Sequence, residues 1–108
     1  MRYSAVRCGH SGQEYPVLLL SEYDDAGWER RRVDVYRDGR VGFADAQEAH
    51  ETQLAAVPMP GLDEIAEETA FKPRELTREE FERLWEQRRA GGNAYWKSVL
   101  QAHGAHKH

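Results

Sequence analysis

The side chains best suited to bind a soft metal ion lie near the two ends of the chain. Cys8 and His10 stand in RCGHS, and His103, His106 and His108 lie in HGAHKH. A structural zinc site needs closely spaced ligand pairs in two places, such as C-x-x-C and H-x-x-x-H, and neither spacing is present. We therefore expect no metal ion and no cofactor. We also expect Cys8 to be a partly buried thiol rather than a nucleophile, which would need a base and a lowered pKa.

Two other combinations could be posed as catalytic groups, namely Asp45 with His50 and Glu51, and Ser98 with His103. Neither has a glycine elbow, a pair of oxyanion donors or an orienting spacing around it. The sequence also contains no G-x-G-x-x-G and no phosphate-binding loop of the Walker type. We therefore expect no catalytic residues and a protein that is not an enzyme.

Five arginines lie within seventeen residues of the segment WERRRVDVYRDGRVGFA, from Trp28 to Ala44. The central RDGR predicts a tight hairpin. A two-residue loop would scatter the apolar side chains over both faces, whereas a three-residue loop with Gly39 in a left-handed bulge places Val33 and Val35 opposite Phe43 and Val41. Because a slip of one residue exchanges the faces of a whole strand, the second register is predicted.

In this register Arg30, Arg32 and Tyr36 lie on the outward face of the hairpin, beside Asp34. One interpretation is a solvated face with cross-strand ion pairs, each contributing a few tenths of a kcal/mol. The other is a surface that binds a protein or an acidic peptide, since Trp, Tyr and Arg are enriched at the centres of interfaces.

The second charged segment is acidic and includes Asp63, Glu64, Glu67 and Glu68. Its carboxylates either keep a helix surface solvated or attract a basic protein and steer its association. Residues 45–86 carry four Lys or Arg against twelve Asp or Glu, a net charge of −8, in a chain of net charge −4. Such a segment repels phosphate backbones, so nucleic acid is not an expected partner.

The elements that must position these residues can be read from apolar spacing and turn signals. LTREEFERLWEQRRAGG predicts a helix from Arg78 to Ala90, with Thr77 as N-cap, Glu80 completing a capping box, and Phe81, Leu84 and Trp85 buried. Residues 45–56 fit a helix and an acidic loop equally well. The expected strands are residues 2–8, 17–23, 28–36 and 40–44, with a short extra strand near 74–76.

These elements predict an α+β fold, in which a four-stranded antiparallel meander sheet is covered on one face by a C-terminal helix. Residues 1–90 would form one domain, and residues 91–108 a C-terminal extension with a short helix and a His-containing tail. The length of 108 residues suits one modest core. The longest apolar run, Val17 to Leu20, cannot span a bilayer, so we expect a cytoplasmic protein that does not bind membranes.

Four segments also carry a resemblance, namely PVLLLSEYD, WERRRVDVYRDGRVGFA, PMPGLDEIAEETAF and ELTREEFERLWE. Over roughly residues 2–88 they resemble a family of short uncharacterised bacterial domains, some of them regarded as immunity proteins of polymorphic toxin systems. The resemblance implies no catalytic residues.

The function expected from these observations is a non-enzymatic protein-binding domain, and the resemblance favours an immunity protein that occludes a basic toxin. The alternative is a small ligand-binding domain or enzyme with a pocket between sheet and helix, near Trp28, Tyr36 and Trp85. The sequence does not indicate an oligomeric state.

Overall fold

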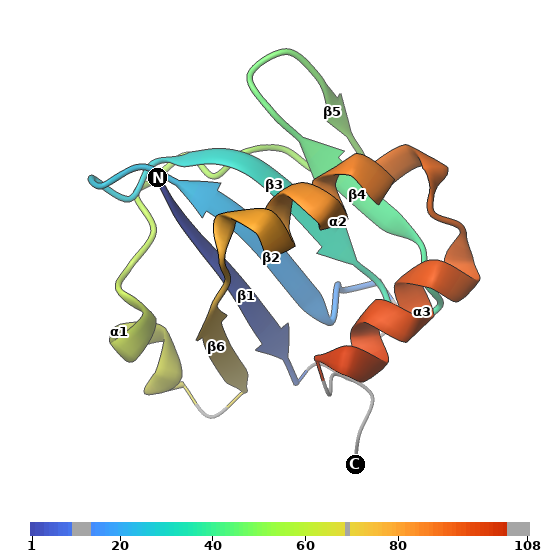
Figure 1. Cartoon of the computed structure of the whole chain (residues 1–108). Helices are drawn as coiled ribbons and strands as arrows, with labels where there is room; N and C mark the ends of the chain where they lie inside the picture. Colours follow the sequence, from blue (N-terminus) through green and yellow to red (C-terminus); the bar gives the residue numbers. More distant parts are fainter. Residues whose placement is uncertain (10–13, 69, 104–108) are drawn as a thin grey trace.

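The computed structural model describes residues 1–9, 14–68 and 70–103, which form one six-stranded antiparallel sheet with three helices (Figure 1). The order of strands across the sheet is β5-β4-β3-β2-β1-β6. In chain order the elements are β1 (Arg2–Cys8), β2 (Leu18–Tyr23), β3 (Glu29–Val35), β4 (Val41–Ala44), β5 (Ala49–His50), α1 (Leu62–Ala66), β6 (Phe71–Glu75), α2 (Arg78–Ala90) and α3 (Asn93–Ala102).

The predicted α+β class and the antiparallel meander of β1 to β4 are confirmed, but the count of four strands is wrong. The extra strand expected near residues 74–76 is β6, which pairs antiparallel with β1 and so occupies the edge opposite β5. Residues 45–56 form neither of the two expected structures, a helix or an acidic loop, because they contain a turn and a short strand. The Asp45 carboxylate accepts the backbone N–H groups of Gln47 and Glu48, at 2.9 Å each, and the two-residue strand β5 follows that turn.

The hairpin between β3 and β4 has the register predicted from its apolar pattern. Val33 pairs with Phe43 and Val35 with Val41, and the Tyr36 N–H donates to the Arg40 carbonyl at 2.9 Å. Gly39 closes the loop with φ of +89°, in the left-handed region that glycine adopts without a steric cost.

Helices α2 and α3 cover the same face of the sheet (Figure 1). The Thr77 hydroxyl accepts the Glu80 N–H, and the Glu80 carboxylate accepts the Thr77 N–H, so the predicted capping box is present. Phe81, Leu84 and Trp85 are buried as expected. The helix expected after residue 91 is also present, and it packs three side chains into the same core: Trp96, Val99 and Leu100. The predicted cover by a single C-terminal helix is therefore incomplete.

The opposite face of the sheet is not the solvated surface that the alternation of β3 predicts. Asp34 is only 3% exposed and Ser21 only 4%. The chain between β5 and α1 lies against this face, where the Met59 N–H donates to the Gly27 carbonyl at 2.8 Å, and α1 packs beside β6. The expected exposure of Asp34 is therefore wrong, because Arg32 pairs with it, and Arg32 itself borders a pocket with the segment 55–60.

Candidate functional site

The exposed arginines of the β3 to β4 hairpin have partners within the protein. Arg30 donates to the Asp24 carboxylate at 2.6 Å. The Arg40 guanidinium lies 4.2 Å from the centre of the Tyr36 ring and 3.9 Å from the Glu51 carboxylate. These contacts agree with the interpretation of this segment as an ion-paired face, since they neutralise its positive charges locally.

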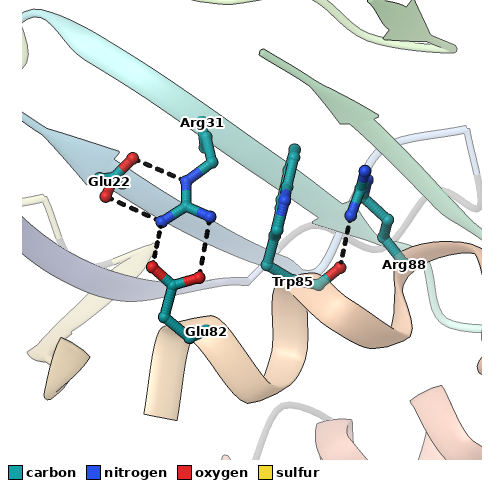
Figure 2. Close-up of polar contacts among 5 residues, drawn as sticks. All are labelled: Glu22, Arg31, Glu82, Trp85 and Arg88. Atoms are coloured by element: carbon teal, nitrogen blue, oxygen red, sulfur yellow. Dashed lines mark hydrogen bonds and ion pairs between the residues drawn. The ribbon is translucent and has the colours of Figure 1, made fainter. Parts of the chain in front are cut away.

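Arg31 lies on the α2 side of the sheet and joins two carboxylates. It donates two hydrogen bonds to Glu22, at 2.7 and 2.9 Å, and two to Glu82 of α2, at 3.0 and 2.6 Å. Figure 2 shows the Trp85 ring between the guanidinium groups of Arg31 and Arg88, which lie 5.2 and 4.0 Å from the ring centre. Hydrogen bonds from Arg31 lower the pKa of both Glu22 and Glu82. This cluster attaches α2 to the sheet.

A pocket of about 450 Å³ lies on the other face, between the sheet, the segment 55–60 and α1. Its walls are mainly apolar. They are formed by Val6, Leu19, Pro58, Met59, Ile65 and Phe71.

A connected polar network lies beside these apolar walls, and three of its members, Ser21, Glu29 and Arg32, line the pocket. The Ser21 hydroxyl donates to Glu29 at 2.8 Å, and the Ala55 N–H donates to the other oxygen of Glu29 at 2.9 Å. Arg32 donates to Asp34 at 2.8 Å and lies 3.6 Å from Glu29. Because these polar groups pair with one another, a ligand in the pocket would contact mainly the apolar walls.

Cys8 is buried on the same face of the sheet as Asp34. Burial raises the pKa of its thiol to about 11, and the nearby Asp34 carboxylate adds to the effect. A thiol with this pKa is protonated at neutral pH and is a poor nucleophile.

The described residues contain no group of three or more His, Cys, Asp or Glu side chains arranged to hold a metal ion. His10, His106 and His108 lie outside the described residues. His103 ends α3, and its Nδ1 lies 3.4 Å from an Arg74 guanidinium nitrogen. Among the described residues, no helix is long and apolar enough to cross a membrane.

Helix α1 and the two residues that follow it place four carboxylates at the edge of the pocket or next to it. Asp63, Glu64, Glu67 and Glu68 are all exposed, and Glu64 and Glu68 line the pocket. Within the described part of the chain, none of the four takes part in an ion pair. One oxygen of Glu64 accepts the Gly61 N–H at 3.4 Å, a long cap contact. The α1 carboxylates, as we call these four, therefore carry a local negative charge that the described residues do not neutralise.

The sequence predicted two separate candidate surfaces, one with the arginines of β3 and one with the acidic residues 63–68. The structure brings members of both together. Arg32 from β3 and the carboxylates of Glu64 and Glu68 border one pocket. Arg30 and Tyr36, which were grouped with Arg32, are not among the residues that line it.

The pocket described here is not the one expected near Trp28, Tyr36 and Trp85, since none of these residues lines it and Trp85 is buried on the side of α2 that faces the sheet. The pocket does lie between sheet and helix, but the helix is α1.

The apolar walls were missed as candidate site residues, although one signal for them was present. Leu19 lies within the unbroken run from Val17 to Leu20, a pattern typical of a strand covered on both faces. Met59 and Phe71 come from segments far along the chain, and no local pattern relates them to Leu19.

A family model described as a domain of unknown function (DUF6881) matches residues 2–90 of the chain. The matched region includes the six strands, α1, α2 and every residue that lines the pocket, and it ends before α3. No curated protein and no solved structure matches the chain.

Proposed function

Because the chain belongs to the DUF6881 family, whose description assigns no function, we propose from its site that it is a non-enzymatic protein-binding domain that holds a basic partner against α1. The observation that carries the proposal is the negative charge of the α1 carboxylates, which no described residue pairs, next to an apolar pocket. Exposed charges of one sign raise the rate at which an oppositely charged partner meets the surface. Apolar area beside them provides the burial that keeps the complex together.

The finer proposal is that the partner is a basic toxin and that the domain acts as its immunity protein. The resemblance of the segments named above supports this choice of partner. A toxin whose active site attracts anionic substrates has a positively charged entrance, and the α1 carboxylates would cover it. Inhibition would then follow from occlusion and would need no chemistry from the domain.

The proposal is tested by selecting binders from a phage-displayed library of random linear peptides on the immobilised domain. We expect the enriched peptides to be rich in Lys and Arg. The double variant Asp63→Lys/Glu67→Lys, which leaves the pocket lining intact, should reduce the association rate of these peptides by about tenfold at low salt. This difference should shrink above physiological ionic strength, where the Debye length falls below about 8 Å.

The matched control reverses two charges elsewhere, at Glu79 and Glu86 on the exposed side of α2. The Glu79→Lys/Glu86→Lys variant changes the net charge by the same amount, so it should affect association much less if the location of the charge matters. Selection of acidic peptides, or of none, would contradict the proposal. It would also fail if Arg30→Ala or Tyr36→Ala abolished binding while Asp63→Lys/Glu67→Lys had no effect, because the arginine segment would then be the binding face.

A further inference from the structure

The pocket beside α1 has features of a preformed site for one side chain of a partner. Two hydrogen bonds fix the segment that forms its outer wall, from the Ala55 N–H to Glu29 and from the Met59 N–H to the Gly27 carbonyl. Pro58 and Pro60 restrict the backbone of that segment further. A wall ordered before binding reduces the entropy that association would cost.

The apolar surface of the pocket continues to its exposed rim. Val57 lines the pocket and is 66% exposed, the highest value among the exposed large hydrophobic residues. The volume of about 450 Å³ lies in the lower part of the range for ligand sites. It is large enough for one aromatic or branched aliphatic side chain and part of the backbone that carries it.

The charges around the pocket indicate which residues would be favoured next to such a side chain in the partner. Among the described residues, Arg32 is the one cation that lines the pocket, and it is paired with Asp34 and close to Glu29. The rim carries the carboxylates of Glu64 and Glu68, which have no ion pair among the described residues. An anionic group would be repelled here, whereas a Lys or Arg beside the apolar side chain would meet a carboxylate at the rim.

We propose that this pocket receives an aromatic or aliphatic side chain of the basic partner, while an adjacent Lys or Arg of that partner pairs with Glu64 or Glu68. The inference rests on the proposed function and specifies how the partner is recognised. The apolar side chain supplies most of the affinity, because a fully desolvated anchor usually dominates an interface. The basic neighbour supplies orientation and selects against acidic sequences.

The test uses the same phage-displayed library of random linear peptides and the full chain. Enriched peptides should carry an aromatic or aliphatic residue within two positions of a Lys or Arg. Replacing that residue by Ser in the synthetic peptide should raise the dissociation constant at least tenfold. Val57→Ser and Ile65→Ser should each weaken binding of the original peptide at least fivefold, and Val57 is exposed enough for its variant to fold normally.

Trp28→Ser is the matched control, because Trp28 is an exposed aromatic residue outside the pocket lining. It should change the dissociation constant by less than twofold. Basic peptides without a shared apolar residue, bound equally by the Val57→Ser and Ile65→Ser variants, would overturn this inference and leave the proposed function standing. Selection of no basic peptide would overturn both.

A third outcome concerns small molecules. Nile red, a neutral apolar dye, should be displaced from the pocket by the selected peptide. If the dye bound in the pocket, lost affinity in the Ile65→Ser variant and was not displaced, the pocket would be a small-molecule site and the inference would be wrong.

Discussion

Arg31 differs from its neighbours because it is the arginine that joins strand β3 to helix α2. Its side chain is only 19% exposed, and its two partners come from β2 and α2, so it connects three elements. Removing one member of a partly buried ionic group leaves the others partly desolvated without a counter-charge. The contribution of Arg31 to stability should therefore exceed that of Arg30, whose side chain is 55% exposed in its pair with Asp24.

We expect Arg31→Met to lower the free energy of unfolding by about 2 kcal/mol at pH 7, less than for a fully buried pair because the Glu82 side chain is 36% exposed. Arg30→Ala should lower it by less than about 1 kcal/mol. The pKa values of Glu22 and Glu82 are lowered in the folded state, so their contribution is present above the unfolded pKa of about 4.3. It is lost as pH falls through the folded values. The difference in the free energy of unfolding between wild type and Arg31→Met should therefore become smaller below about pH 4. Urea denaturation at several pH values measures this free energy. If Arg31→Met and Arg30→Ala lowered it equally, the role given to Arg31 would be contradicted.

The sequence alone could not identify the partners of the individual arginines in this segment. The three in the run 30–32 are adjacent and chemically identical, but the Glu82 partner of Arg31 is 51 residues further along the chain. Strand alternation separates Arg31 from Arg32 by face, and only the tertiary structure shows that both faces are covered.

At the scale of elements, the accurate predictions are those with a local physical cause. The register of the β3 to β4 hairpin follows from a turn of three residues and a shared apolar face, and α2 begins where Thr77 and Glu80 cap it. The pairing of β6 with β1 and the position of the segment 55–60 depend on contacts between distant parts of the chain. No periodicity within those segments specifies such contacts, which explains why the strand count and the segments that cover the second face were missed.

The tip of the β3 to β4 hairpin contacts the start of α3, and this contact should make Gly39 sensitive to substitution. The Asn93 side chain donates to the Asp38 carbonyl at 2.9 Å, and a Cβ atom on Gly39 would lie 2.4 Å from the Asn93 carbonyl oxygen. We expect Gly39→Ala to destabilise the protein by about 2 kcal/mol or more, from left-handed backbone strain and overpacking.

Gly39→Asn separates these two causes, because asparagine tolerates the left-handed region better than alanine but adds the same Cβ atom. Thermal unfolding should show that both variants are destabilised. The NMR resonance of the Trp96 indole N–H in α3 should also shift in both. A Gly39→Asn variant as stable as wild type would mean that the contact with α3 is not the constraint.

At the scale of the molecule, the two faces of the sheet differ in how they are covered. Helices α2 and α3 fill one face with a continuous aromatic and aliphatic core. The other face is covered by a proline-containing segment and a five-residue helix, which leave the pocket open. The candidate site could be predicted only in part, because the acidic run of α1 is visible in the sequence while its meeting with Leu19 and Arg32 depends on how the chain folds back.

The hydrophobic core requires more of the chain than the family match covers. The family match ends at residue 90, but Trp96 and Leu100 of α3 are 0% and 2% exposed and belong to the same core as Phe81. Burying each such side chain contributes about 1.5 to 3 kcal/mol, and the total stability of a domain is about 5 to 15 kcal/mol. A chain ending at residue 91 should therefore lose cooperative thermal unfolding and bind hydrophobic dyes. Removal of residues 104–108 leaves α3 intact, so the melting temperature should change by no more than about 2 °C, in the presence or absence of a chelator. A cooperatively folded protein ending at residue 91 would show that α3 is an accessory to the domain rather than part of its core.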